Sequence, residues 1–296
     1  MVCESQEPER IVIVIYCGYG DESTDDAKNR VYAVGAVFGQ ESDYVEIKKP
    51  WQNRLGGRIF HSADLEHGRK DFADLKPGEG RKLYKDLVSI VCGSKLIGEG
   101  IAINITEYRK EFPNDHEDAP YLWLFGDAVS DMSDLASLSV PPSPVEVTFD
   151  RNQENEYNAT LLYELIRRSK RTGFGKFLAD KVSFATRKTF GVQLADLFAR
   201  EAMKRLNDQI TPNNRPARVS FSRLSRAQRM RFRVIGWREF QEKKQTLMKS
   251  TTREVGNMRK YREWLNLKRI QDCQSNRIHY IEAHAKEFGY ERLDNA

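Results

Sequence analysis

The chain has 296 residues, of which 40% are hydrophobic, and a formal net charge of +5, so it can bury one large core or a core with an appendage. Its four cysteines, Cys3, Cys17, Cys92 and Cys273, are scattered without a CxxC motif, which argues against a zinc or disulfide framework and favours a reducing cytoplasm. No apolar run approaches eighteen residues, so we expect neither a membrane span nor a signal peptide.

The first 50 residues predict the start of a β-sheet. The continuous β-branched run at residues 11–16 predicts a buried strand, which Gly18 and Gly20 end. Residues 31–38 predict a second strand, and residues 44–47 predict a short third one. Turn-forming residues separate the first two strands, so we expect an antiparallel meander at the beginning of the domain.

Helical and strand patterns alternate after this meander. Apolar residues recur at i, i+4, i+7 and i+8 from Leu83, which predicts a helix. Further patterns predict a strand over residues 96–105, a helix over 121–138, a strand over 145–149, a helix over 157–166, a strand over 182–185 and a helix over 192–206. This order predicts an α/β fold, a mixed sheet flanked by helices, in a first domain that spans residues 1–211.

Residues 212–296 differ from the rest of the chain in charge. They hold 20 Lys and Arg against 9 Asp and Glu, a net charge of +11, whereas residues 1–211 hold 28 against 34, a net charge of −6. Helical patterns over residues 225–248 and 253–272 predict a basic, helical C-terminal extension. The charge imbalance indicates a polyanionic partner, and the extension is also a candidate site for a protein partner or for a homo-oligomer.

An arginine-rich segment lies near the start of this extension. Residues 218–233 contain six arginines and no acidic residue: Arg218, Arg223, Arg226, Arg229, Arg231 and Arg233. Guanidinium groups bind phosphate through paired hydrogen bonds, and nearby aromatic rings stack on bases, so these six are candidates for nucleic-acid binding. The alternative is a solvated helix or one that faces another subunit.

Acidic residues next to or inside apolar elements are the main candidates for chemistry. Asp21 and Glu22 follow the first strand in a Gly-Asp-Glu-Ser motif, Asp150 ends a strand, and Asp196 lies in an otherwise apolar helix. A buried carboxylate costs free energy unless a positive charge or hydrogen bonds compensate it, and a divalent metal is the simplest such charge. Adjacent strand residues point to opposite faces, so only one of these two can face a given site. We favour Asp21 over Glu22 as the metal ligand.

The helix around Asp196 has one polar seam. On a helical wheel, Gln193, Asp196 and Arg200 cluster together while the other positions are apolar, so we expect the seam to face a polar cleft. The simpler interpretation is an ion pair between Asp196 and Arg200, which are four residues apart.

Two more residues belong to this candidate group. His61 and Asp64 lie three residues apart and would share one face of a helix. Simpler interpretations exist here as well: His61 as an exposed loop residue, and Asp21 and Asp150 as turn or capping residues.

Carboxylates at two strand ends and on one helix can converge on a single point. Mg²⁺ and Mn²⁺ suit oxygen ligands, and two such ions about 4 Å apart can activate water for phosphodiester cleavage. The sequence contains no GxSxG motif and no P-loop, and Gly18-Tyr19-Gly20 lacks the third glycine of a dinucleotide-binding motif. The residues therefore favour metal-dependent phosphate chemistry.

The chain resembles the family called domain of unknown function 3800 over residues 11–206. The resemblance rests on four segments of this sequence, residues 20–23, 60–65, 149–150 and 193–199. It implies a ribonuclease H-like fold, whose nucleases use clustered carboxylates and divalent metal. In this chain it implies a catalytic cluster with the following members: Asp21, Asp150 and Asp196 as metal ligands, and Glu22, His61 and Asp64 nearby. Thr24 departs from the family, which usually has glycine after Asp-Glu-Ser.

The first functional hypothesis is therefore a nuclease that uses Mg²⁺ or Mn²⁺ on RNA or DNA. The second is a module on the same fold that binds nucleic acid or protein without catalysis. A third is a phosphoryl-transfer or nucleotide-hydrolysing enzyme that uses the same metal site on a small substrate. The sequence predicts nucleic acid as a partner and no membrane.

Overall fold

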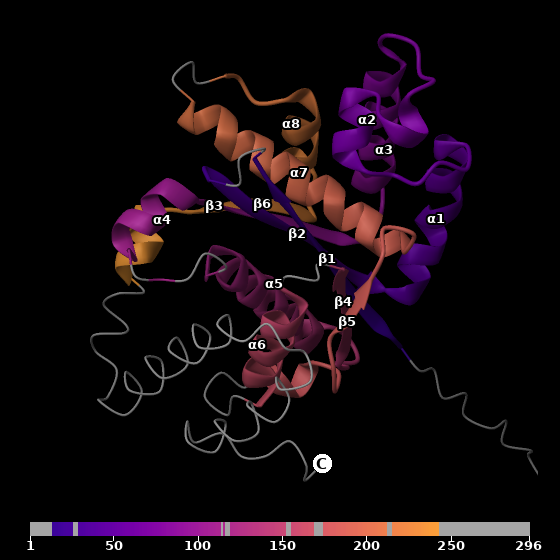
Figure 1. The fold of residues 1–296 in the computed structure, drawn as a ribbon. Helices are drawn as coiled ribbons and strands as arrows, with labels where there is room; N and C mark the ends of the chain where they lie inside the picture. The colour runs from indigo at the N-terminus through magenta and orange to yellow at the C-terminus, as the bar shows by residue number, and fades with distance from the viewer. Residues whose placement is uncertain are drawn as a thin grey trace, which may run out of the picture.

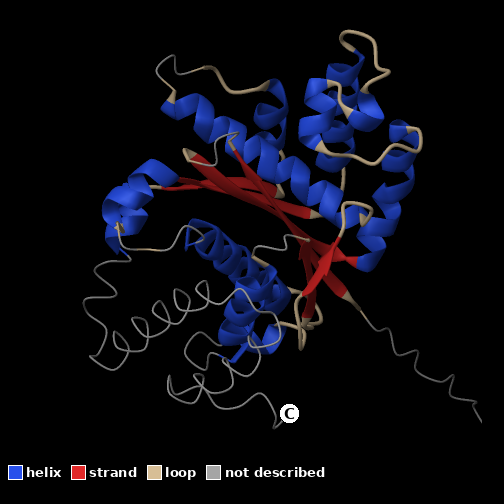
Figure 2. Cartoon of the chain, in the orientation of Figure 1, coloured by secondary structure: helices blue, strands red, loops and turns tan. Residues whose placement is uncertain are grey.

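The computed structural model describes residues 14–25, 29–113, 115, 119–151, 155–168, 174–211 and 215–242. One six-stranded sheet organises them, in the order β5-β4-β1-β2-β3-β6. The strands are β1 (Tyr16–Thr24), β2 (Val31–Gln40), β3 (Ile97–Asn104), β4 (Val145–Asp150), β5 (Ser183–Ala185) and β6 (Met230–Ile235). Figure 2 shows this sheet between two helical layers, which confirms the expected mixed α/β architecture.

The first three strands form the antiparallel meander, and the later strands add to its two sides. β1 pairs with β2, and β2 with β3, in antiparallel register. On one side β4 runs parallel to β1 and β5 parallel to β4, and on the other side β6 runs parallel to β3. The carboxyl ends of β1 and β4 therefore lie side by side near the middle of the sheet.

Helices cover both faces of this sheet (Figure 1). The upper layer in Figure 1 contains α1 (Glu41–Leu55), α2 (Ser62–His67), α3 (Glu79–Cys92), α7 (Phe190–Ile210) and α8 (Val219–Arg226). The lower layer contains α5 (Ala119–Leu138) and α6 (Glu156–Arg168), and α4 (Ile105–Glu111) lies at one end of the sheet. Separate hydrophobic clusters fill the two layers. No helix in the described ranges has the length and apolarity that crossing a membrane requires.

The predicted strand at residues 44–47 is wrong, because this segment lies within α1. Asp43 accepts the backbone N–H of Gln40 at 3.0 Å and so caps the start of the helix. The buried side chains of the helix are Tyr44, Ile47, Trp51 and Leu55, which recur every three or four residues. This helical spacing outweighs the short β-prone run in the middle of it.

The first strand is displaced from its predicted position. It starts at Tyr16 and continues to Thr24, and residues 11–13 of the prediction lie outside the described residues. Gly18 and Gly20 lie inside the strand and do not end it. Because they have no side chain, they leave room for the side chains of Met132 and Phe149. A Cβ on Gly18 would lie 2.4 Å from Met132 Sδ, and one on Gly20 would lie 2.2 Å from the Phe149 ring. Asp21 and Glu22 consequently lie within the strand.

The prediction of a helix over residues 225–248 is wrong for residues 230–235, which form β6. Residues 230–234, Met-Arg-Phe-Arg-Val, alternate apolar and charged side chains, a period of two that is typical of a strand. β6 extends the central sheet, so the sheet includes chain on both sides of the expected boundary at residue 211. The predicted helix over 253–272 and residues 243–248 lie outside the described residues.

Candidate active site

Parallel pairing of β1 with β4 places Asp21 beside Asp150. The register matches Gly20 with Phe149, so the next residue on each strand is one of the two aspartates. The Phe149 ring fills the space over Gly20 in the cluster that packs against α5. Since successive side chains alternate between faces, Asp21 and Asp150 both point to the opposite face, which α7 covers.

A close contact between α7 and the sheet brings Asp196 to the same face. Asp21 is paired across the sheet with Gly35 of β2. A Cβ on Gly35 would lie 2.1 Å from the backbone oxygen of Ala195 and 2.3 Å from the backbone nitrogen of Ala199. The helix backbone therefore rests directly on this glycine, and Asp196 projects from the turn that makes the contact.

Two of the three aspartates are buried, and the three repel one another. Asp21 is 2% exposed and Asp196 5% exposed, while Asp150 is partly buried. Burial raises the pKa of Asp21 well above its usual range, and the charges of Asp196, Glu22 and Asp150 raise it further. Burial also raises the pKa of Asp150, which Arg187 opposes from 3.6 Å, measured between Nε and Oδ2. Arg187 thus supplies one positive charge to this group.

Asp196 contacts the segment that contains His61. The backbone N–H of Ser62 donates to Asp196 Oδ2 at 2.6 Å. Burial raises the pKa of Asp196, whereas the charge of His61 and the Ser62 hydrogen bond oppose the rise. His61 therefore lies close enough to the cluster to act on Asp196 and Asp150 electrostatically.

Asp64 lies in the same segment as His61 and contacts it. Its Oδ2 lies 2.6 Å from His61 Nδ1 and 3.0 Å from Lys70 Nζ. Burial works to raise the pKa of Asp64, but the hydrogen bonds from Lys70 and His61 outweigh it and lower the pKa. Asp64 is thus a charged partner of His61, which it contacts at Nδ1.

The polar seam of α7, formed by Gln193, Asp196 and Arg200, contacts residues 60–66 along their length. Gln193 Oε1 accepts hydrogen bonds from Trp51 Nε1 at 3.2 Å and from the backbone N–H of Phe60 at 3.4 Å. Arg200 Nη2 lies 2.7 Å from Glu66 Oε2, so the partner of Arg200 in the structure is Glu66, and the simpler interpretation of an ion pair with Asp196 does not apply. Sequence reasoning found the seam but missed Ser62 and Glu66, since neither carries a local signal.

Glu22 lies on the other face of the sheet. It follows Asp21 in β1, so its side chain points toward α5. After burial, the charge of Glu22 is the main cause that raises the pKa of Tyr121 in α5. Glu22 therefore affects Asp21 through its charge but does not share the face that Asp150 and Asp196 share.

The six candidate arginines do not form one surface. Arg231 and Arg233 bind Glu99 and Asp131 at 2.6 to 3.0 Å, on the α5 face of the sheet. On the other side, Arg218 lies 2.5 Å from Glu66. Three remain with no carboxylate partner among the described residues: Arg223, which donates to Ser89 Oγ, Arg229, which donates to the backbone oxygen of Lys95, and the exposed Arg226.

The cluster is not a ready-made metal site. In the described part of the chain, no three or more His, Cys, Asp or Glu side chains are arranged so that they could hold one ion together. The donor chemistry nevertheless fits a hard divalent cation, because Asp21, Asp150 and Asp196 offer carboxylate oxygens on one face, where burial and then their mutual repulsion raise the pKa of Asp21.

Comparison with known proteins shows distant structural likeness and no match in sequence. No protein-family model matches the chain, and no curated protein matches it in sequence. A solved chain from the PCNA:RNase HII complex of Archaeoglobus fulgidus is similar in structure, with a TM-score of 0.40 and 14% sequence identity. The match covers 66% of this chain and 76% of that chain.

Proposed function

We propose that this protein is a metal-dependent nuclease that hydrolyses phosphodiester bonds in RNA or DNA. The observation that carries the proposal is the convergence of Asp21, Asp150 and Asp196 on one face of the sheet, from three separate elements. A fold gains no stability from crowding buried carboxylates, since each costs free energy to desolvate and repels the others. Such a group is typical of a functional site.

Mg²⁺ or Mn²⁺ is the proposed cofactor. Asp21, Asp150 and Asp196 would hold it, and a divalent ion bound there supplies charge that activates water and stabilises the leaving oxygen. Asp150 now has Arg187 as its nearest cation, at 3.6 Å, so binding of an ion there requires Asp150 to exchange this partner. The Arg187 side chain is 44% exposed, so a phosphate can reach it from solvent.

The residues of the His61 segment have positioning roles in this proposal. Ser62 fixes the orientation of Asp196 through its backbone N–H. Asp64 binds His61 at Nδ1, which leaves Nε2 as the ring atom able to exchange a proton with water or with a leaving group. Glu22 acts through its charge, which raises the pKa of Asp21.

A ribonuclease H-like fold is part of the proposal. The antiparallel meander, the parallel strands added beside β1 and the acidic groups at its centre support the fold that the family resemblance implies. β3, the predicted strand over residues 96–105, lies between β1 and β4 in the sequence but pairs with β2 as the third strand of the meander. β4, which ends at Asp150, therefore pairs directly with β1, which contains Asp21. Membership of the domain of unknown function 3800 family remains part of the proposal.

The proposal is tested by nuclease assay on single-stranded and double-stranded RNA and DNA. We expect cleavage with Mg²⁺ or Mn²⁺, none with EDTA, and none by Asp21→Asn or Asp196→Asn. Lys110→Gln changes an exposed residue on α4 and serves as the control. Cleavage that survives both aspartate substitutions would remove the assignment.

A non-catalytic binding module on the same fold is the second candidate. The observation that favours it is the missing preformed group of three metal ligands in the described residues, which an enzyme of this type needs during turnover. This module would bind nucleic acid equally well with EDTA and with Mg²⁺. Isothermal titration calorimetry with Mg²⁺ or Mn²⁺ on wild type and on Asp21→Asn separates the two candidates. Metal binding that Asp21→Asn loses favours the nuclease, and no binding to wild type favours the binding module.

A further inference from the structure

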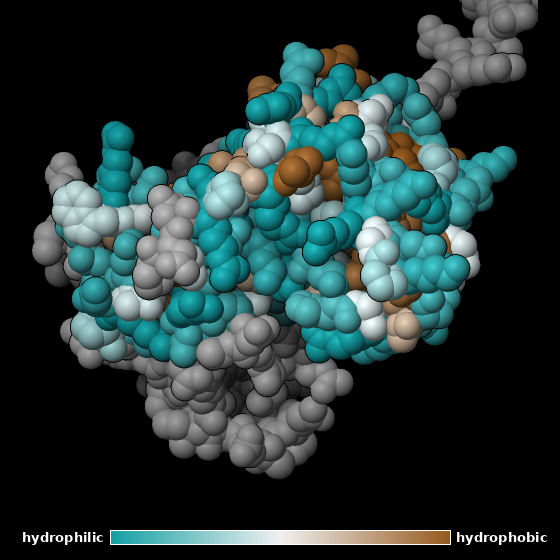
Figure 3. Space-filling view, turned by 90° about the horizontal axis from the view of Figure 1, so that it is seen from above, coloured by the Kyte–Doolittle hydropathy of each residue, from teal (hydrophilic) through white to brown (hydrophobic). Residues whose placement is uncertain are grey.

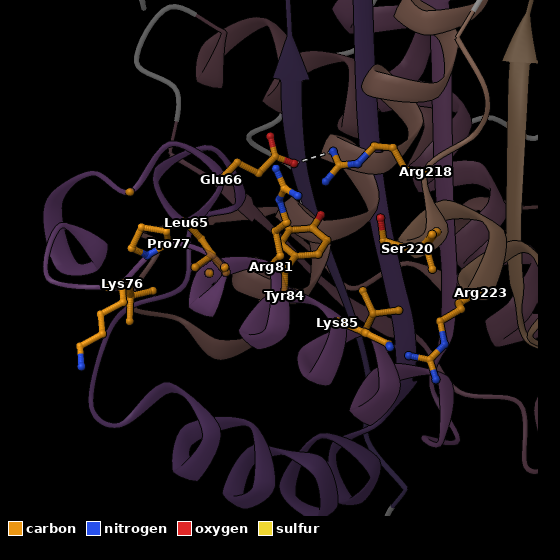
Figure 4. Close-up of a pocket in the computed structure, with 16 residues that line it drawn as sticks. Leu65, Glu66, Lys76, Pro77, Arg81, Tyr84, Lys85, Arg218, Ser220 and Arg223 are labelled. Atoms are coloured by element: carbon orange, nitrogen blue, oxygen red, sulfur yellow. Dashed lines mark ion pairs between the residues drawn. The ribbon is translucent and has the colours of Figure 1, made fainter.

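A cavity lies between α2, α3 and the start of α8. Its volume is about 690 Å³, within the range of sites that bind small molecules. Leu65 and Glu66 of α2 line it, at the far end of that helix from Ser62 and the acidic cluster. Figure 4 shows side chains from α2, α3 and α8 around it.

The cavity has an excess of positive charge. Five basic side chains line it, and Glu66 is the one acidic side chain among its lining residues: Lys76, Arg81, Lys85, Arg218 and Arg223 are the basic ones. Glu66 and the buried Glu201 bind Arg218, so this arginine is already neutralised. In the described ranges no carboxylate lies within ion-pair distance of the other four basic side chains.

Three of these four cations belong to the cavity itself. In Figure 4 the Lys76 side chain points away from the other labelled residues, whereas Lys85 and Arg223 extend toward the same end of the cavity. Arg81 lies beside Tyr84 in the same view. Cations without counter-charges repel one another, and an anionic ligand relieves that repulsion.

The first turn of α3 adds backbone donors to this charge. Gly78, with φ of +88°, precedes the helix, and Gly78, Gly80 and Arg81 all line the cavity. The N–H groups of a first helical turn have no acceptor within the helix and attract anions such as phosphate. The N–H of Glu79 donates to the backbone oxygen of Lys76 at 3.0 Å, so the donors that this turn offers are those of Gly80 and Arg81. Glu79 accepts the backbone N–H of Lys76 at 2.9 Å and is not among the lining residues, so its charge is directed to the preceding loop.

The remaining walls are apolar. Leu65, Leu75 and Val88 line the cavity beside the cations, so it offers room for an uncharged, flat group next to an anionic one. A bare inorganic anion would leave this part empty. The outer face over α7, α8 and α1–α3 is mostly hydrophilic where it is described, with small scattered hydrophobic areas (Figure 3), which does not suit a lipid surface.

We propose that this cavity binds a nucleoside phosphate, with the phosphate at Lys85 and Arg223 and the nucleoside against the apolar wall. Arg223 donates to Ser89 Oγ, one helical turn beyond Lys85, so these two cations lie together, while Arg81 and the first turn of α3 add positive charge at the other end of the cavity. The ligand is either a free nucleotide or the terminal nucleotide of a nucleic-acid strand, which share this chemistry. The inference goes beyond phosphodiester hydrolysis, because it concerns a second site and its test requires no turnover.

The test is binding of adenosine 5′-monophosphate with a fluorescent label on the ribose, measured by anisotropy with the full chain in EDTA. We expect Lys85→Gln/Arg223→Gln to bind at least about tenfold more weakly than wild type, since two charge-assisted hydrogen bonds are lost. The matched control is Lys82→Gln/Lys110→Gln, which removes two exposed cations outside the cavity. Equal affinity in the two double variants would overturn the proposal.

Competition identifies the parts of the ligand that are recognised. Unlabelled adenosine 5′-monophosphate should compete better than adenosine alone and better than inorganic phosphate alone. Inorganic phosphate that competes as well as the nucleotide would contradict a nucleoside-phosphate site. Preference for a 5′-phosphorylated oligonucleotide over the mononucleotide assigns the ligand to a strand end, and the reverse preference assigns it to a free nucleotide.

One further variant separates this proposal from the nuclease assignment. Asp21→Asn removes a proposed metal ligand that does not line the cavity, so we expect it to keep wild-type affinity for the labelled nucleotide. A nuclease assay that fails while this binding persists would reject the hydrolase and leave the second site. Loss of binding in Asp21→Asn, with the melting temperature unchanged, would mean that the nucleotide binds at the acidic cluster.

Discussion

Ser62 donates its backbone N–H to Asp196 Oδ2 over 2.6 Å, across 134 positions of the chain. This contact ties the loop that carries His61 to the helix that carries one of the buried carboxylates. Because the donor is a backbone group, substitution of Ser62 does not remove it. The orientation of Asp196 is therefore fixed by the path of the chain at residues 60–66 rather than by a side chain.

Replacement of Asp196 by asparagine should separate its structural and functional roles. Asn retains an oxygen that accepts the Ser62 N–H but carries no charge, so repulsion from Asp21 is relieved. We expect metal-dependent cleavage to disappear while the melting temperature stays the same or rises. Asp196→Ala is the comparison: it leaves the Ser62 N–H without an acceptor and should cost about 1–3 kcal/mol of stability. Activity that persists in Asp196→Asn would make this residue structural.

In the metal-free protein, the contribution of Asp21 and Asp196 to stability should fall as pH rises. The folded pKa values of Asp21 and Asp196 are raised, so between the ordinary aspartate value of about 3.9 and the higher folded value the native state binds more protons than the unfolded state. This contribution is fully present below the unfolded pKa and is lost as pH increases through the folded one. Thermal melts in EDTA across this pH range measure the effect. The melting temperature of Asp21→Asn/Asp196→Asn should depend less on pH than that of wild type.

Divalent metal should reverse the same trend. A cation binds the ionised carboxylates, so Mg²⁺ or Mn²⁺ should raise the melting temperature more at high pH than at low pH. The measurement is the shift in melting temperature on addition of metal to wild type and to Asp21→Asn. Equal shifts in the two proteins at every pH would show that the ion binds elsewhere.

Gly35 should tolerate no side chain. An alanine Cβ there would lie 2.1 Å from the backbone oxygen of Ala195, and backbone cannot move aside as a flexible side chain can. Gly35→Ala should cost about 1–3 kcal/mol and displace Asp196 from Asp21, with loss of activity even where the protein still folds. Gly126→Ala is the matched control, because its nearest neighbour is Leu162 Cδ2 at 3.5 Å. Denaturant unfolding of both variants provides the test.

The arginine-rich segment should divide into two functional groups. Arg231 and Arg233 bind Glu99 and Asp131 on the α5 face, so Arg231→Gln/Arg233→Gln should lower stability without changing the salt dependence of nucleic-acid binding. Arg223→Gln/Arg226→Gln, on α8, should reduce the slope of log affinity against log salt concentration. Affinity measured at several salt concentrations decides between them, and a reduced slope only in the first variant would contradict the division.

Local sequence patterns were sufficient for much of the fold. Apolar periodicity identified the helix around Asp196 and its polar seam, because the spacing of apolar residues reflects the face that a helix buries. It failed at residues 44–47, where a helix cap and helical spacing outweigh a short β-prone run. It failed again at residues 230–235, where an alternating pattern was interpreted as part of a helix.

The sequence by itself determined that carboxylates lie next to apolar strands and inside an apolar helix, since the chain is chemically unusual at those positions. Tertiary structure decided which of them face one another. The pairing of β1 with β4 sets the common face of Asp21 and Asp150, and the contact of α7 with Gly35 brings Asp196 to it. Strand register and helix packing join residues far apart in the chain, and a shift of one residue in register would turn a side chain to the opposite face.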